Sequence, residues 1–348
     1  MIPRVLASIG LLSFAFFATF ASLSSAQVEP IELVIGVRAD AAPFSFARNA
    51  GPRFNPPGTG PLFDKGYDGY VVQVCDVVLE ALMAERSGIT VRVVRVTAKT
   101  RFAALGEAEP KAEQIDILCD PATITKDRVK NHYTSVPVYL SGITFAYQDP
   151  FPGGELCASL IGAVAETTTE TRGMSLILDS GKWPRYRAQI AEALAAPRQI
   201  NDTPPAIPSD VDSSDGVCRR PVILWANDHD ALARNFCDKH VLYYVGDVEI
   251  IRSKLKFLNE NGACPFVIDN TTYTDERYAL FARIPSDAGK ASVVLRFFSI
   301  LAEKVYTDKE QASSILIESY GRVFKDYRPS RRLQAFYWSL TGDTGVSE

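Results

Sequence analysis

Residues 115–128 have the sequence IDILCDPATITKDR. The largely apolar run at 115–118 predicts a buried strand, and a cysteine, Asp120 and Pro121 follow it directly. Two threonines and Arg128 come next. A turn leading into a capped helix has this composition, and so does a group of donors directed at an anion. The rest of the chain must decide between the two interpretations.

The stretch is part of an alternation of strands and helices. Apolar and β-branched runs predict strands at 33–37, 91–96 and 115–118, and helical spacing predicts helices at 70–84 and 100–107. This order predicts right-handed crossovers and a parallel sheet with helices on both faces. Ligands bind beyond the carboxyl ends of such strands, where residues 119–128 lie.

The same alternation begins again in the second half of the chain. It predicts strands at 160–164 and 222–225 and helices at 168–180 and 230–236. Residues 201–216 are rich in Pro, Asp and Ser, which predicts an exposed loop. The two α/β units are joined near 142–152. The chain returns through 278–282 and ends with helices at 291–304 and 309–320.

The N-terminus predicts export. Arg4 precedes an apolar run at 5–20, and small residues lead to Ala26. This is the pattern of a signal peptide at 1–26, cleaved after Ala26, so we expect a periplasmic protein. A retained N-terminal anchor is the alternative.

Composition excludes several classes of protein. The net charge is −4 without a basic block, which argues against nucleic acid and anionic membrane surfaces as partners. The length favours two lobes. The cysteines and the three histidines show no metal-ligand spacing, so we expect no metal and no cofactor.

Four segments carry a resemblance to a known family: IGVRADAAPFSF (35–46), GYVVQVCDVVLEAL (69–82), IDILCDPATITKDR (115–128) and IGAVAETTTE (161–170). In this order they resemble the extracellular solute-binding proteins of the polar amino acid class, which are related to the ligand-binding domains of ionotropic glutamate receptors. The resemblance spans about 31–325. It implies an α/β, two-lobed type II periplasmic-binding fold with two hinge strands. Lobe 1 would contain 27–147 and 279–348, and lobe 2 would contain 148–278.

The resemblance implies roles for the first-lobe residues. Arg128 matches the arginine that forks onto a ligand carboxylate, for which a planar guanidinium is suited. Thr123 would add a hydroxyl or a backbone N–H. Pro121 offers only its carbonyl, which suits an ammonium group. A capped helix start with a surface arginine remains the alternative for Arg128.

The second lobe is expected to contribute from helix starts. Thr167 and Thr168 open a helix, where free N–H groups bind anions, and simple capping is compatible with this role. Asp228 is the acidic residue that the resemblance assigns to the ligand's amino group. Asn227 is an alternative alignment, and plain helix capping is an alternative role for Asp228.

The sequence departs from the family at five positions. Ala41 and Ala98 stand where aromatic rings usually enclose the ligand. Arg38, Asp120 and Glu166 add charge, which favours a ligand with a second polar group or a wider cleft. We therefore do not expect a site selective for leucine or phenylalanine.

Two further parts of the first lobe belong to the expected binding face. The Pro-Phe turn includes Phe44, which we assign to the ligand site. The Pro- and Gly-rich segment 50–66 is longer than the family's usual connection. It is either part of the cleft mouth or a passive loop.

The predicted function is capture of an amino acid or a related amino or carboxylic acid, and its delivery to an ABC transporter permease by a monomer. An accessory or sensory binding protein of the same fold is the first alternative. A cyclohexadienyl dehydratase-like enzyme, with Glu166 or Glu170 as general acid, is the second. No motif for hydrolysis is present, and we predict a protein that is not an enzyme.

Six cysteines in an exported protein predict disulfides. Fifteen pairings are possible for six cysteines. The predicted topology favours Cys75–Cys119, Cys157–Cys218 and Cys237–Cys264.

Overall fold

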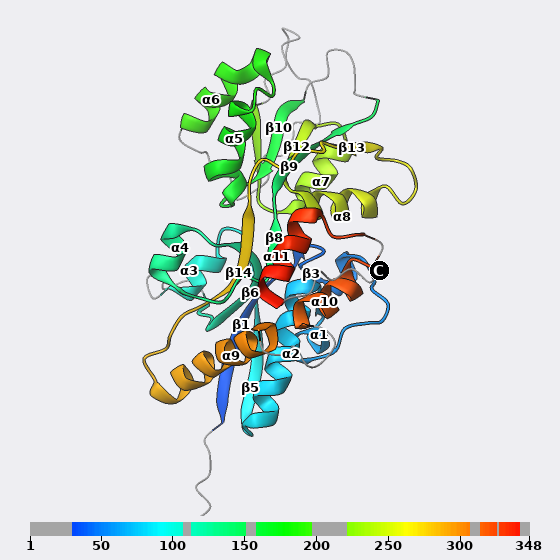
Figure 1. Cartoon of the computed structure of the whole chain (residues 1–348). Helices are drawn as coiled ribbons and strands as arrows, with labels where there is room; N and C mark the ends of the chain where they lie inside the picture. The colour runs from blue at the N-terminus through cyan, green and yellow to red at the C-terminus, as the bar shows by residue number, and fades with distance from the viewer. Residues whose placement is uncertain are drawn as a thin grey trace, which may run out of the picture.

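A computed structural model describes residues 30–106, 113–150, 158–196, 221–306, 314–325 and 327–341. Figure 1 shows two lobes, each built on its own sheet with helices packed against it. Both sheets contain parallel strands. The expected fold class, a two-lobed α/β protein, is confirmed.

The first lobe is built on a sheet with the strand order β5-β1-β6-β14-β7, and β8 also pairs with β14. β1 runs parallel to β5 and β6, whereas β14 is antiparallel because it carries the chain back from the second lobe. The strands are β1 (Ile31–Arg38), β5 (Ile89–Val96), β6 (Ile117–Thr123), β7 (Tyr133–Thr134), β8 (Tyr139–Ser141) and β14 (Glu276–Ala282).

One helix shows why the first core forms. The long α2 (Tyr70–Glu85) buries Val71, Val74, Val78 and Leu82, the residues whose helical spacing predicted it. Burying an aliphatic side chain of this kind contributes about 1.5–3 kcal/mol. The other elements of this lobe are α1 (Pro61–Asp64), α3 (Arg101–Leu105), α4 (Lys126–Asn131), α9 (Ala288–Tyr306), α10 (Ile315–Val323), α11 (Arg331–Thr341), the 3-10 turn η1 (Arg48–Ala50), and the small sheet of β2 (Asp40–Ala41), β3 (Ser45–Ala47) and β4 (Tyr67–Asp68).

The second lobe has the strand order β11-β10-β12-β9-β13. β10 is parallel to β11 and β12, and β9 is antiparallel to β12. The strands are β9 (Ile143–Gln148), β10 (Ser159–Val164), β11 (Ile223–Ala226), β12 (Val241–Asp247) and β13 (Phe266–Ile268). The helical elements are the π-helical turn η2 (Thr169–Gly173), α5 (Met174–Asp179), η3 (Pro184–Tyr186), α6 (Arg187–Ala195), α7 (His229–Cys237) and α8 (Val248–Leu258).

Two adjacent segments carry the chain between the lobes. The outgoing segment passes from β8 to β9 at Gly142, and the returning one passes from β13 to β14. A Cβ at Gly142 would lie 2.7 Å from the carbonyl oxygen of Thr274, so the close approach requires glycine. β9 pairs with β12 and β13 of the second sheet. The change of sheet therefore falls at Gly142, before the expected lobe boundary at 147.

Two disulfides lie within the lobes. Cys75–Cys119 joins α2 to β6, with 6.3 Å between Cα atoms, and Cys237–Cys264 joins α7 to the loop before β13, with 5.1 Å. Both pairs match the pairing that topology favoured. Cys157 and Cys218 lie outside the described residues, as do the expected signal peptide and the loop at 201–216. None of the helices in the described ranges has the length and apolarity needed to span a bilayer.

Peptide mapping under non-reducing conditions tests the complete pairing. We expect Cys75–Cys119 and Cys237–Cys264, and therefore Cys157–Cys218, because cysteines of an exported protein pair in an oxidising compartment. A crosslink from Cys75 or Cys119 to any other cysteine would contradict both the structure and free movement of the lobes.

Candidate ligand site between the lobes

The lobes touch each other at the carboxyl ends of β1 and β6. Asp40 Oδ2 accepts a hydrogen bond from the backbone N–H of His229 at the start of α7, at 3.0 Å. The hydroxyl oxygens of Thr123 and Thr168 lie 3.5 Å apart across the cleft. Ala98 belongs to a buried cluster of the second lobe. A small side chain at that position thus lets the lobes pack directly, where the family usually places a ring.

A buried ion pair supports this contact. Arg38 Nε donates to Asp40 Oδ1 at 2.9 Å and Nη2 donates to Oδ2 at 2.6 Å. Burial alone would raise the pKa of Asp40, but the charge and hydrogen bonds of Arg38 outweigh it and hold the pKa well below its usual value. Asp40 is therefore a carboxylate, which favours its place at the N-terminus of α7.

The role expected for Arg38 changes accordingly. Its guanidinium forms an ion pair with Asp40 in the same region of the first lobe, so it is not available to bind a second polar group of a ligand. Asp40 was not among the residues expected in the site. The two-residue spacing of opposite charges after a strand end was the available signal.

A second buried ion pair lies at the end of β6. Asp120 is fully buried and pairs with Arg101 of α3. Arg101 also donates to the carbonyl of Pro121 at 3.3 Å, so the acceptor that we expected for a ligand ammonium already has a donor. Asp120 Oδ1 and Arg101 Nε have no hydrogen-bond partner among the described residues. Such buried atoms are unfavourable unless another group satisfies them.

Arg128, which the resemblance assigns to a ligand carboxylate, lies in α4, a few residues after the end of β6. Its backbone N–H is bound by Thr125, the N-cap of α4, at 3.3 Å, so the predicted helix cap and the predicted arginine occur together. Nη1 donates to the carbonyl of Thr123 at 2.8 Å, and the guanidinium stacks on the ring of Phe102 at 4.3 Å. Within the described part of the chain, Arg128 forms no ion pair. Its remaining N–H groups suit a carboxylate.

Nearby charges keep Arg128 cationic at neutral pH. Burial and, to a smaller extent, the adjacent charge of Arg101 lower the pKa of Arg128 to about 9, although Asp120, Glu276 and Asp247 act to raise it. A pKa of about 9 still leaves the guanidinium charged at pH 7.

Two acids lie at the boundary between the lobes. Asp247 ends β12, and Glu276 begins β14. Burial and the charge of Glu276 together raise the pKa of Asp247 to about 7. Asp247 Oδ1 and Glu276 Oε2 have no hydrogen-bond partner in the described ranges. The region around Arg128 thus combines a cation with buried carboxyl oxygens that can still accept hydrogen bonds.

The threonines of the second lobe are placed as expected at a helix start. Thr167 donates its hydroxyl hydrogen to the carbonyl of Val164 at 2.8 Å. Thr168 is buried and faces Thr123 across the cleft. Glu166 has a left-handed backbone, with φ of 59°, and its N–H donates to Glu170 Oε2 at 2.9 Å.

Two of the predicted residues have other roles in this structure. Asp228 is the N-cap of α7 and accepts a hydrogen bond from the N–H of Ala231 at 2.7 Å, as the capping alternative expected. Phe44 is fully buried in the first-lobe core, with its ring 4.8 Å from Tyr139 and 5.1 Å from Tyr278. Assigning Phe44 to the ligand site was therefore incorrect, because the core encloses its ring.

Comparison with known proteins supports the fold. No protein-family model and no curated protein matches the sequence. Among solved structures, an ancestral arginine-binding protein bound to glutamine has 15% identity and a TM-score of 0.52, covering 84% of this chain and 97% of its own. The arginine-, lysine-, histidine-binding protein ArtJ from Geobacillus stearothermophilus has 15% identity and a TM-score of 0.52, covering 87% of this chain and 99% of its own. The chain has the fold of these two-lobed amino-acid-binding proteins.

Replacing Asp247 tests its raised pKa. An unfolded aspartate ionises near pH 4, whereas the native carboxyl keeps its proton to about pH 7. The native state thus binds more protons between these values, and this carboxyl lowers stability as pH rises through them. Asp247→Asn removes the effect. We compare the unfolding free energy of the variant minus that of wild type at two pH values. This difference should be about 2–3 kcal/mol more positive at pH 8 than at pH 5.

Urea unfolding at the two pH values measures this difference. Asp238→Asn, which changes an exposed carboxylate in the same lobe, is the control and should show no such pH dependence. An equal effect of Asp247→Asn at both pH values would show that its carboxyl titrates normally.

Proposed function

We propose that the chain is a periplasmic solute-binding protein that holds an amino acid or a related small acid between its lobes and delivers it, as a monomer, to the permease of an ABC transporter. The observation that carries the proposal is Arg128. Its guanidinium is held by a backbone carbonyl and a ring and has no ion pair within the described part of the chain. It lies beside Thr123, which meets Thr168 of the other lobe.

The carboxylate of the solute binds Arg128 in this proposal. Two parallel N–H groups of a guanidinium match the two oxygens of a carboxylate. The hydroxyls of Thr123 and Thr168 add hydrogen bonds from both lobes, so the carboxylate is fully bound only when the lobes are together. That requirement couples capture of the solute to closure.

The amino group of the solute binds the buried acids. Asp120 Oδ1, Asp247 Oδ1 and Glu276 Oε2 are acceptors without a hydrogen-bond partner among the described residues, and all three carboxyl groups act electrostatically on Arg128. An ammonium group has three donors and no acceptor. It would relieve the unfavourable burial of these oxygens. This assignment replaces Pro121 and Asp228, whose acceptors have internal donors.

Entry of the solute requires the lobes to separate. The bond from His229 to Asp40 and the contact between Thr123 and Thr168 close the cleft in this structure. The two segments that connect the lobes lie side by side at Gly142 and Thr274. Small backbone rotations there would open the cleft as a hinge.

Arg128→Ala tests the proposal directly. A thermal-shift screen of amino acids, polyamines and organic acids first identifies the solute, and calorimetry then measures its affinity. Removing Arg128 should weaken binding by about 2–5 kcal/mol, because the buried carboxylate loses its charged partner. Folding should be retained, because the side chain makes one hydrogen bond to a carbonyl and packs on one ring.

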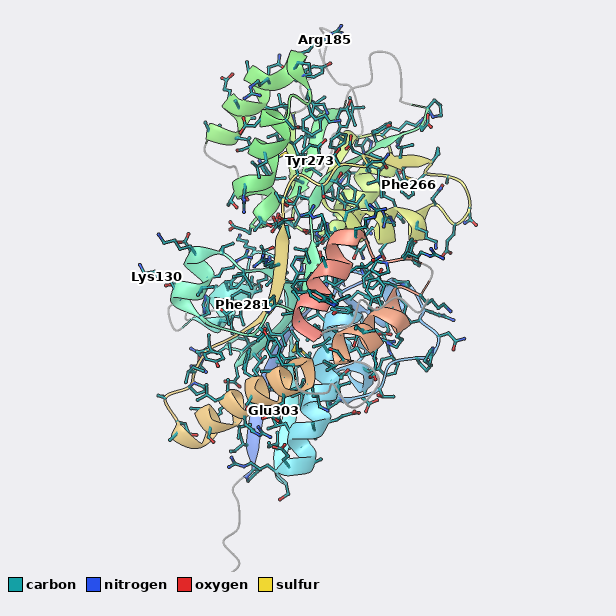
Figure 2. All side chains as sticks on the ribbon, in the orientation of Figure 1. Lys130, Arg185, Phe266, Tyr273, Phe281 and Glu303 are labelled. Carbon is teal, nitrogen blue, oxygen red and sulfur yellow. A yellow bond between two sulfur atoms is a disulfide. The ribbon has the colours of Figure 1, made fainter. Side chains whose placement is uncertain are left out.

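Lys130→Ala is the matched control. Lys130 is exposed on the same helix and extends outward at the edge of the molecule (Figure 2). It should leave both affinity and stability unchanged. If Arg128→Ala and wild type bound the solute with equal affinity, Arg128 would not be the residue that binds the carboxylate.

A further inference from the structure

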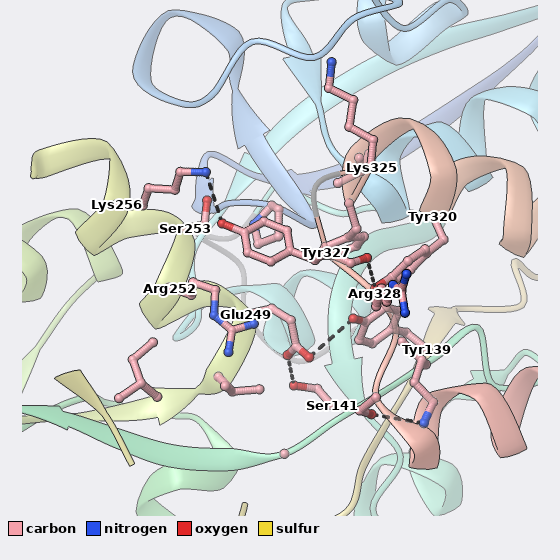
Figure 3. Close-up of a pocket in the computed structure, with 18 of the residues that line it drawn as sticks. Tyr139, Ser141, Glu249, Arg252, Ser253, Lys256, Tyr320, Lys325, Tyr327 and Arg328 are labelled. Atoms are coloured by element: carbon pink, nitrogen blue, oxygen red, sulfur yellow. Dashed lines mark hydrogen bonds between the residues drawn. The ribbon is translucent and has the colours of Figure 1, made fainter. Parts of the chain in front are cut away.

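A cavity separate from the candidate ligand site lies on the hinge side of the molecule. It has a volume of about 760 Å³ and opens between α8 of the second lobe and residues 320–325 and 327–333 of the first. Ser141, Gly142 and the returning segment at 268–272 also line it (Figure 3). Arg128, Thr123 and Thr168 are absent from its lining. Its volume falls within the range of about 300–1,000 Å³ that is typical of small-molecule sites.

Cationic side chains from both lobes line this cavity. Arg252 and Lys256 are four residues apart on α8, so they lie on one face of the helix. Arg328 comes from the first-lobe segment that faces α8. In the described ranges, neither Arg252 nor Arg328 forms an ion pair. By contrast, Arg322 and Arg332, which also line the cavity, pair with Asp68 and Asp275.

An aromatic ring lies among these cations. Tyr327 is 5.5 Å from the guanidinium of Arg252 and 5.3 Å from the ammonium of Lys256, measured to the ring centroid. Lys256 Nζ donates to the hydroxyl of Tyr327 at 3.3 Å (Figure 3). The half-buried ring thus fixes the two α8 cations at the mouth of the cavity and adds an apolar surface.

Among the acidic groups of the lining, Glu249 acts electrostatically on Arg252 but forms no ion pair with it in the described ranges. Glu249 accepts hydrogen bonds from Tyr139, at 3.3 Å, and from Ser141, which turns its carboxyl toward the hinge (Figure 3). Asp269 pairs with Lys182 at 2.9 Å and accepts from the N–H of Thr271 at 2.8 Å. Glu260 is exposed. The lining therefore keeps an excess of positive charge at Lys256 and Arg328, with the charge of Arg252 partly offset by Glu249.

We propose that this cavity is a second ligand site, for a small organic anion that carries a carboxylate or phosphate group. Arg252 and Arg328 bind the oxyanion from opposite lobes, and Tyr327 packs against the body of the ligand. Guanidinium groups bind such oxyanions through paired hydrogen bonds.

A ligand bound in this cavity would influence the movement of the lobes, because both lobes contribute to its lining. Its lining comes from α8 of one lobe, Arg328 of the other and both hinge segments, so a bound anion favours one arrangement of the lobes. A ligand that prefers one arrangement changes the affinity of the interlobe cleft, and the effect is reciprocal. The anion would thus act as an effector of solute binding.

Displacement of a fluorescent anion tests the proposal. Anilinonaphthalene sulfonate, an aromatic anion, is bound to the full chain, and citrate and inorganic pyrophosphate are titrated as competitors. We expect saturable displacement by at least one of them, and the choice between the two distinguishes a carboxylate from a phosphate ligand. In the double variant Arg252→Glu and Arg328→Glu, the apparent affinity of the competing anion should fall by about tenfold or more.

Three controls separate this site from the interlobe cleft. Arg128→Ala should leave displacement unchanged, so failure of the solute site and failure of this site are distinguishable. Arg185→Glu reverses an exposed charge at the far end of the second lobe (Figure 2) and should also have no effect. Arg328→Gln alone alters one exposed residue and should weaken displacement even if the double variant folds poorly. Absence of displacement by both anions, or equal displacement in wild type and the Arg252/Arg328 variants, would overturn the proposal.

Discussion

The carboxylate of Asp40 joins the two lobes. Arg38 binds both of its oxygens from the first lobe, and the first N–H of α7 binds one of them from the second. A buried charge is tolerated only when it is paired and hydrogen-bonded, and removing one partner of such a pair typically costs about 3–5 kcal/mol. Opening the cleft strips the α7 bond from Asp40 but leaves the pair with Arg38 in place. Closure is therefore favoured by a modest interaction that a hinge motion can break and restore.

The need to pair buried charges also decides which groups of the cleft are available to bind a ligand. Arg38 pairs with Asp40, and Asp120 pairs with Arg101. Two of the charged residues that depart from the expected pattern are therefore neutralised within the protein. Arg128 is held by a carbonyl and a ring, which orient a guanidinium without neutralising it. Oxygens of three buried acids lack hydrogen-bond partners among the described residues. The proposed site would match a zwitterion better than an apolar side chain, because each end of the zwitterion would meet opposite charge.

Local patterns predicted much of the fold, and long-range pairings explain what they missed. The helix α2 follows from its helical spacing and the strand β1 from its apolar run. The strand β6 (Ile117–Thr123) only begins within the run expected at 115–118, so its continuation through Asp120 and Pro121 was not predicted. The helix α8 was not predicted, because a charged residue, Lys254, interrupts its apolar face. Lys254 can be buried there because it pairs with Asp230 of another helix. In the site, Arg128 and its cap were recognisable within one segment. The bond from His229 to Asp40 spans 189 residues and has no local signal.

The central claim is that a solute closes the cleft between two hinged lobes, and the distance across that cleft tests it most directly. Spin labels at Lys130→Cys in the first lobe and Arg172→Cys in the second, both exposed, report this distance by pulsed electron resonance. Without solute we predict a distribution that includes distances longer than in the closed structure. A solute that raises the melting temperature should remove the long component. A distribution that such a solute leaves unchanged would contradict the account.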